Sequence, residues 1–70
     1  MEPVAVGLAG AGPWARMTHA PMLAAGPDTR LTAVWARRES AATELAGGYG
    51  AVACTSFDEL LQRCDAVAFA

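Results

Sequence analysis

The sequence predicts an α/β fold in which a doubly wound parallel sheet is built from alternating strands and helices. Four short apolar runs lack the alternation of a half-exposed strand, so each fits a strand that is covered on both faces. Helical segments of 8 to 13 residues separate these runs, and a glycine-rich turn follows the first of them. Because crossovers between parallel strands are right-handed, the expected order in the sheet is 3-2-1-4.

The composition excludes several classes of protein. The 70 residues carry a formal charge of −2, with 54% hydrophobic and 17% charged residues. This excludes a disordered tail, and the mildly acidic balance gives no electrostatic basis for binding nucleic acid or an anionic membrane. No uninterrupted apolar run reaches the roughly 18 residues of a membrane span, and the acidic N-terminus is unlike a signal peptide. We therefore expect a cytoplasmic protein.

The first strand is expected at Val4–Ala9, an apolar run that ends at the glycine turn Gly10–Gly12. Proline suits the first turn of a helix, and we expect the helix after the turn to cover about Pro13–Ala25. Pro21 lies inside this helix and lacks the N–H that a helix interior uses for hydrogen bonding. It therefore predicts a kink or break.

The second strand is expected at Leu31–Ala36, and an alanine-rich helix at about Glu39–Ala46 ends at two glycines. A short third strand follows at Ala51–Cys54. Asp65–Ala70 is the fourth strand, and the order above leaves it as an exposed apolar edge. We therefore expect the isolated chain to self-associate, and we expect the last strands of the domain to lie outside residues 1–70.

A third helix is predicted by a capping box, in which Ser56 and Glu59 each accept a hydrogen bond from the other's backbone N–H. The apolar residues after the cap recur at the spacing of one helix face, which we expect to be buried: Phe57, Leu60, Leu61 and Cys64. The only cysteines, Cys54 and Cys64, match no metal or redox motif. We expect both to be small buried hydrophobes in a reducing compartment.

The glycine turn carries the main functional signal. Residues Gly10–Ala15 fit the pattern G-x-G-x-x-[G/A], which binds dinucleotides when it follows a strand and opens a helix. Gly10 would allow the tight turn, and Gly12 would let a pyrophosphate approach the backbone with no Cβ in the way. The alternative is a structural turn in an α/β protein that binds nothing.

The start of the helix behind this turn would hold the phosphates through its free N–H groups and positive dipole. Because Pro13 has no N–H, Trp14 and Ala15 have to supply the donors. Trp14 either covers the cofactor or packs against neighbouring loops. His19 has no carboxylate or cysteine partner nearby in sequence, so we expect a capping or packing role rather than metal binding or catalysis.

The end of the second strand predicts which dinucleotide binds. In NAD-dependent enzymes an acid about 20 residues after the glycines binds the ribose hydroxyls. Ala36 stands there in this chain, followed by Arg37 and Arg38, whose guanidinium groups suit a 2′-phosphate. This favours NADP over NAD. The alternative is a solvated loop in which the arginines pair with Glu39 or Glu44.

The helix that follows strengthens this prediction. Neither Arg38 nor Glu39 is a good N-cap, and Ser40 caps only a helix that begins later. A bound 2′-phosphate would supply the missing acceptor.

These segments resemble the start of the glucose–fructose oxidoreductase and inositol dehydrogenase family. The resemblance covers essentially all 70 residues and rests on short motifs in order: Val6–Gly12, His19–Leu23, Ala33–Arg38, Tyr49–Gly50, Thr55–Leu61 and Asp65–Val67. It implies an NAD(P)-binding Rossmann domain, then an α+β domain that binds sugars or polyols and often assembles dimers or tetramers. The implied reaction is hydride transfer between the nicotinamide and a carbon–oxygen or carbon–nitrogen centre.

Carried onto this chain, the family's cofactor positions are Gly10, Gly12, Pro13 and Trp14 at the pyrophosphate, and Arg37 and Arg38 at the adenosine ribose. The chain departs from the family in two ways. Many members have an acid near Ala36, and members place a proton-transfer lysine in a Glu-Lys-Pro motif after the fifth strand. This chain contains no lysine, so we expect no catalytic residue in it.

The leading interpretation is therefore the NADP-preferring start of an oxidoreductase. A non-catalytic nucleotide-binding or regulatory module is the alternative. A methyltransferase domain also has a glycine turn, but such domains usually carry an acid where Ala36 stands.

Overall fold

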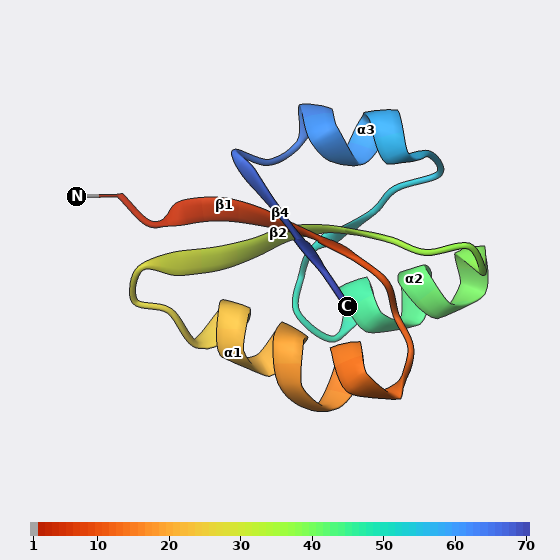
Figure 1. Ribbon diagram of the computed structural model, residues 1–70, viewed down its shortest axis with the longest axis horizontal. Helices are drawn as coiled ribbons and strands as arrows, with labels where there is room; N and C mark the ends of the chain where they lie inside the picture. The colour runs from red at the N-terminus through yellow and green to blue at the C-terminus, as the bar shows by residue number, and fades with distance from the viewer. Residues whose placement is uncertain (1) are drawn as a thin grey trace.

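The computed structural model describes residues 2–70 and contains a parallel four-stranded sheet with helices on both faces (Figure 1). In chain order the elements are β1 (Val4–Ala9), the π-helical turn η1 (Ala15–His19), α1 (Ala20–Ala25), β2 (Thr29–Trp35), α2 (Glu39–Gly47), β3 (Val52–Ala53), α3 (Phe57–Gln62) and β4 (Ala66–Phe69). The strands lie in the order β3-β2-β1-β4. The predicted α/β class and strand order are confirmed, and the sheet is part of a Rossmann-type fold.

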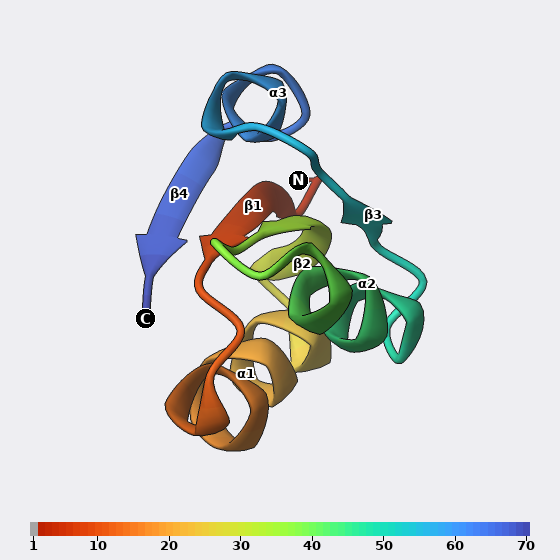
Figure 2. The same ribbon diagram turned by 90° about the vertical axis from the view of Figure 1, so that its right-hand side faces the viewer.

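The two faces of the sheet are covered unequally. Helices α1 and α2 lie side by side on one face, and α3 lies on the other (Figures 1 and 2). Under α1 and α2, Leu8 and Val34 of the sheet pack with Leu45 of α2 in the larger core cluster. Under α3, a smaller cluster joins Cys54 and Leu60 to the alanines of β1 and β2. Strand β1 lies between these layers and is buried after its first residue, as its continuous apolar run predicts.

The first helix differs in form from the prediction. Helical residues run from Pro13 to Ala25 with no break at Pro21. The irregularity lies ahead of the proline, where the N–H of Ala20 bonds to the carbonyl of Ala15 and closes a π-helical turn. Pro21 then lies in the first turn of α1, where a missing N–H costs no hydrogen bond. A change of hydrogen-bond register therefore accommodates the proline.

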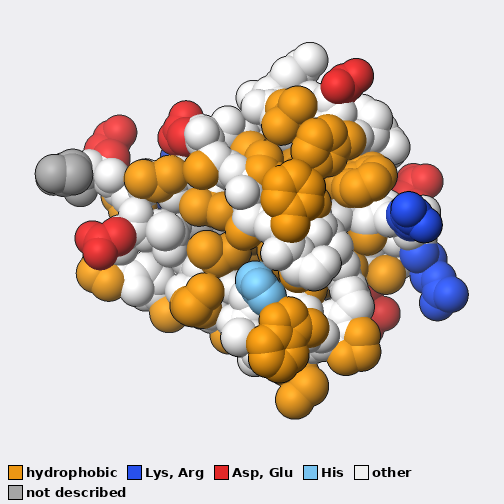
Figure 3. Space-filling model, in the orientation of Figure 1, with side chains coloured by type: hydrophobic (Ala, Val, Ile, Leu, Met, Phe, Trp, Pro, Cys, Tyr) orange, Lys and Arg blue, Asp and Glu red, His pale blue; other side chains and the backbone are white. Residues whose placement is uncertain are grey.

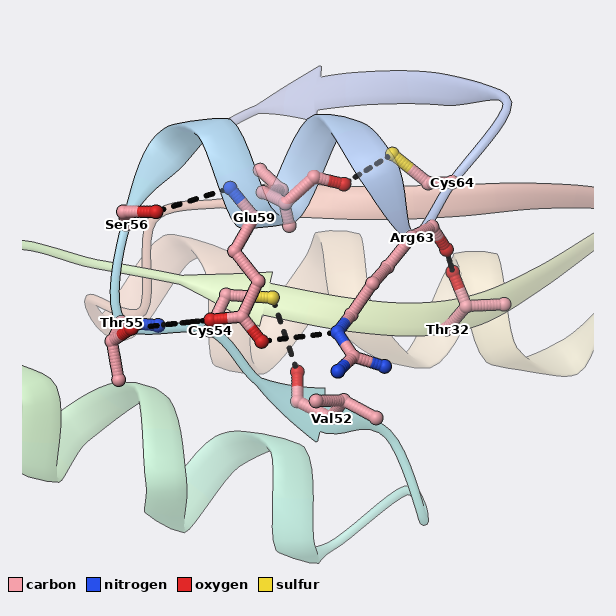
Figure 4. A network of polar contacts seen from close by, with 9 residues as sticks. Thr32, Val52, Cys54, Thr55, Ser56, Glu59, Arg63 and Cys64 are labelled. Carbon is pink, nitrogen blue, oxygen red and sulfur yellow. Dashed lines mark hydrogen bonds and ion pairs between the residues drawn. The ribbon is translucent and has the colours of Figure 1, made fainter.

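Helix α3 begins with the predicted cap but with a different second partner (Figure 4). Ser56 Oγ accepts a hydrogen bond from the Glu59 N–H at 3.1 Å. The Glu59 carboxylate accepts from the N–H of Thr55, at 2.9 Å, rather than from that of Ser56. The predicted apolar face is buried at Leu60 but 49% exposed at Leu61. A helix of six residues meets the sheet along one narrow stripe, and Leu60 occupies its centre.

The cysteines and the sheet edge largely follow expectation. Cys54 is buried and Cys64 is half-buried, and both are free thiols. Burial, reinforced by the charge of Glu59, raises the pKa of the Cys54 thiol, which keeps it in its inert form. β4 lies at one edge of the sheet with Phe69 70% exposed, so the apolar edge is present and self-association stays a prediction.

Within residues 2–70, no helix has the length and apolar character needed to span a bilayer.

Candidate functional site

An open cleft of about 840 Å³ lies where the carboxyl ends of β1 and β2 meet the helices that follow them. Ligands of α/β proteins bind at this end of the strands. The lining comes from the glycine turn, from η1, from the connection between β2 and α2, and from α2 itself. It includes Gly12, Pro13, Arg16, Ala36, Arg38 and Glu44.

The two glycines of the turn have different reasons to be glycine. Gly10 has a φ of 129°, which L side chains rarely adopt, and a Cβ there would lie 2.9 Å from the carbonyl oxygen of Ala70. A Cβ at Gly12 would meet no atom within 4 Å, so this position faces the open space of the cleft. The fold therefore requires glycine at position 10. At position 12, only a ligand entering the cleft would require it.

The start of the first helix presents unused backbone donors beside the cleft. The Gly10 N–H is bound by the Trp35 carbonyl at 2.7 Å, and the Arg16 N–H by the Gly12 carbonyl at 3.0 Å. The N–H groups of Trp14 and Ala15 lie between these bonds and donate to no acceptor within residues 2–70. Two free donors at the positive end of a helix are the arrangement that binds phosphate groups.

The side chain of Trp14 lies outside the lining of the cleft. It is 66% exposed, and its ring meets the ring of His19 edge-on, with centroids 6.1 Å apart. His19 Nδ1 is buried and finds no partner in the described part of the chain. Among residues 2–70, no three His, Cys, Asp or Glu side chains come close enough together to hold a metal ion.

The connection between β2 and α2 brings one of the two predicted arginines into the cleft. Arg38 lines it, whereas Arg37 is exposed outside the lining. Neither guanidinium forms an ion pair within residues 2–70, where Glu44 pairs instead with Arg16, at 3.1 Å. The alternative of a solvated loop therefore finds exposed arginines but no pairing with Glu39 or Glu44. Figure 3 shows basic side chains grouped at the end of the molecule where β2 passes into α2.

Helix α2 starts without a side-chain cap, as predicted. Arg38 is its N-cap residue, and no side chain accepts a hydrogen bond there. The Arg38 carbonyl accepts from the N–H groups of Ala41 and Ala42, at 3.1 and 3.2 Å. Within residues 2–70, the N–H groups of Glu39 and Ser40 have no acceptor. Free amides therefore lie beside a free guanidinium at this end of the cleft.

The sequence did not reveal that Arg16 and Glu44 both line the cleft. They lie 28 residues apart, Arg16 on η1 and Glu44 on α2, so only the placement of η1 beside α2 brings them together. From the sequence, Glu44 was expected only as a possible partner for Arg37 or Arg38. The position of Arg16, directly after the glycine turn, was the one available signal.

The fold and the cleft define a dinucleotide-binding domain of the Rossmann class. A family model described as "Oxidoreductase family, NAD-binding Rossmann fold" matches residues 4–70. The chain therefore belongs to this family, the glucose–fructose oxidoreductase, inositol dehydrogenase and MocA group, and the resemblance seen in the sequence is confirmed. Among curated protein sequences, none matches the chain.

Several solved structures are similar to the whole chain. GenD2 from gentamicin A biosynthesis, in complex with NAD, is 33% identical with a TM-score of 0.89 over 100% of this chain and 20% of its own. UDP-N-acetylglucosamine 3-dehydrogenase GnnA from Acidithiobacillus ferrooxidans is 32% identical with a TM-score of 0.84, over 99% of this chain and 22% of its own. KijD10, a 3-ketoreductase from Actinomadura kijaniata in complex with NADP and TDP-benzene, is 31% identical with a TM-score of 0.80. The match covers 96% of this chain and 21% of KijD10. The chain thus spans about a fifth of the length of these proteins.

Proposed function

We propose that this chain is the NADP-preferring cofactor-binding portion of an oxidoreductase that transfers hydride between the nicotinamide and a sugar, polyol or related substrate. The observation that carries the proposal is the cleft, which has unused amide donors at one end and an unpaired arginine at the other. Residues 1–70 form the N-terminal part of the NAD(P)-binding domain. The last strands of that domain and the substrate domain lie outside them.

The glycine turn fits a diphosphate. The open space beside Gly12 admits a group that a side chain would exclude, and the N–H groups of Trp14 and Ala15 supply its hydrogen bonds. Gly10 holds the turn in place against the end of β4 and contributes through that geometry. Pro13 lines the cleft and begins the helix whose dipole favours the negative charge.

The far end of the cleft fits a ribose that carries a 2′-phosphate. Ala36 has no carboxylate, so this position neither accepts hydrogen bonds from the ribose hydroxyls nor repels a phosphate. Arg38 offers a guanidinium that pairs with no carboxylate, and Arg37, exposed outside the lining, is a second arginine without an ion pair. The free N–H groups at the start of α2 add neutral donors. NADP is the dinucleotide that uses all of these groups.

The bound nicotinamide would supply the hydride, and the residues of this chain bind and orient the dinucleotide. We assign no proton transfer to residues 1–70, which contain no lysine. GenD2 and KijD10 were solved with NAD and with NADP respectively, and the names of GnnA and KijD10 describe a dehydrogenase and a ketoreductase. These names support a sugar or sugar nucleotide as the substrate class.

The test is a titration of the protein with NADPH and with NADH. We expect NADPH to bind at least about tenfold tighter, because bidentate arginine contacts with phosphate are strong. Arg38→Gln should remove most of this preference. Arg30→Gln is the matched control, since Arg30 is an exposed arginine at the other end of β2. Equal affinities of the parent protein for the two nucleotides would exclude the preference.

A non-catalytic nucleotide-binding or regulatory module is the second candidate, favoured by the absence of lysine. Turnover separates the two only in a protein that joins this chain to a substrate domain, because an oxidoreductase oxidises NADPH in the presence of a ketosugar and a regulatory module does not. The isolated 70-residue chain should show no oxidation above background in either case. The cytoplasmic location and the assembly into homo-oligomers stay predictions.

A further inference from the structure

An ion pair crosses the cleft between its two helices. Arg16 of η1 and Glu44 of α2 meet with 3.1 Å between Nη2 and Oε1, and their side chains are 55% and 69% exposed. Both residues line the cleft together with Arg38 and Gly12. Within residues 2–70 the only other ion pair joins Glu59 and Arg63 of the α3 segment, on the opposite face of the sheet.

The pair fixes the charge that a ligand meets. The charged side chains of the cleft lining are two arginines, Arg16 and Arg38, and one glutamate, Glu44. Glu44 follows Ser40 by four residues on α2, so both lie on the helix face that borders the cleft. A carboxylate on this face opposes a phosphate bound at the start of α2. The guanidinium of Arg16 offsets that opposition.

We propose that the Arg16–Glu44 pair tunes the discrimination between phosphorylated and unphosphorylated dinucleotides, with Glu44 acting against a 2′-phosphate and Arg16 screening Glu44. The inference rests on the proposed function and adds two specificity-determining residues to it. In this proposal Arg38 contacts the 2′-phosphate directly, whereas the Arg16–Glu44 pair affects its binding through the electrostatic potential of the cleft.

The exposure of the pair argues for this role over a structural one. Ion pairs between solvent-exposed side chains contribute little to folding stability, because water screens them and both side chains lose rotamer freedom. A 2′-phosphate carries nearly two negative charges, and one bound at Arg38 would share the cleft with both charges of the pair, so these charges would affect its binding.

The experiment measures the dissociation constants of NADPH and NADH by calorimetry at low salt, for the parent protein and three variants. Glu44→Gln should raise the preference for NADPH by about threefold to fivefold, the size expected for one exposed charge acting through water. Arg16→Gln should lower it by a similar factor. The double variant R16Q/E44Q should return to within about twofold of the parent, and about 0.5 M salt should suppress all of these changes.

Two variants control for net charge. Arg30→Gln and Asp58→Asn remove the same charges at exposed positions away from the cleft, on β2 and α3, and should leave the preference unchanged. Circular dichroism confirms that each variant is folded.

The outcomes separate this inference from the proposed function. If the parent binds neither nucleotide, both fail. If the parent prefers NADPH but the Arg16 and Glu44 variants do not change the preference, only this inference fails. Controls that shift the preference as much as the cleft variants overturn it as well, because the effect then belongs to the net charge of the protein.

Discussion

Helices α2 and α3 lie on opposite faces of the same sheet and differ in how the first backbone N–H groups of each helix are hydrogen-bonded. At α3, Ser56 caps the helix and Glu59 accepts hydrogen bonds from Thr55 and Arg63 (Figure 4). At α2, the Arg38 position supplies no side-chain acceptor and its guanidinium finds no acidic partner within residues 2–70. The comparison shows that polar groups satisfied locally stabilise the fold, whereas those left open beside a cleft are available to a ligand.

Electrostatics shows the same difference. The hydrogen bond from the Thr55 N–H, followed by that from the Arg63 guanidinium, lowers the pKa of the Glu59 carboxyl. This carboxylate is therefore ionised and fully engaged at neutral pH. On the α2 side, the one carboxylate of the cleft pairs with Arg16, and Arg38 keeps its charge free.

The largest predicted effects come from replacing the two glycines of the turn, one of which should affect stability and the other nucleotide binding. Gly10→Ala should lower the free energy of unfolding by about 2–4 kcal/mol, because it combines a strained φ with a contact of 2.9 Å to a backbone oxygen. Gly12→Ala should change it by less than about 1 kcal/mol, since its Cβ meets no atom, yet weaken NADPH binding at least about tenfold. Urea unfolding and nucleotide titration measure the two effects. A Gly12→Ala variant that binds NADPH with the parent's affinity would contradict the proposal that the diphosphate binds at this turn.

The next largest effect is expected from removing the side-chain cap of α3. Ser56→Ala removes the acceptor for the Glu59 N–H and should cost about 1 kcal/mol of stability. NADPH affinity should not change, because Ser56 lies outside the lining of the cleft. Thermal unfolding and the same titration measure both quantities. A loss of binding comparable to the loss of stability would mean that the two helix starts are not independent.

The reverse change gives α2 the cap that it lacks. Arg38→Ser places a hydroxyl acceptor at the N-cap and should stabilise the protein by about 0.5–1 kcal/mol. The same substitution removes the cleft guanidinium and should abolish the preference for NADPH over NADH. Opposite changes in Tm and in nucleotide preference would establish that the open helix start serves binding at the expense of stability. If the variant still preferred NADPH, the preference would have to come from residues other than Arg38.

The smallest effect is the pH dependence of the α3 start. Because the folded pKa of Glu59 lies below its ordinary value, its stabilising contribution is fully present above the pKa of the unfolded chain. It is lost as pH falls through the lower, folded value, so the window lies below about pH 4.3. Unfolding curves of the parent and of Glu59→Gln should therefore converge as the pH falls through this window. A constant difference between them would contradict the assignment.

Elements built from continuous local patterns could be predicted from the sequence. Strand β1 has the predicted bounds because its apolar run and the following glycines mark both ends. The missing cap of α2 was also predictable, since a cap depends on two or three adjacent residues. The glycine turn was recognisable for the same reason, and its two glycines differ only through their surroundings in three dimensions.

The features that were missed depend on contacts between distant segments. Gly7 is one example, because a Cβ there would lie 2.8 Å from Cys64 Sγ and from Leu60 Cδ1, so glycine lets α3 approach β1. The π-helical turn ahead of Pro21 depends on a choice between two hydrogen-bond registers that residue types alone do not fix. The Arg16–Glu44 pair needs the packing of two helices.

The most direct test is a crystal structure of the protein grown with NADP. We predict that the diphosphate lies within hydrogen-bond distance of the N–H groups of Trp14 and Ala15, with the 2′-phosphate on Arg38 at the start of α2. A diphosphate bound elsewhere on the protein, or a ribose phosphate that makes no contact with the β2–α2 connection, would contradict this assignment.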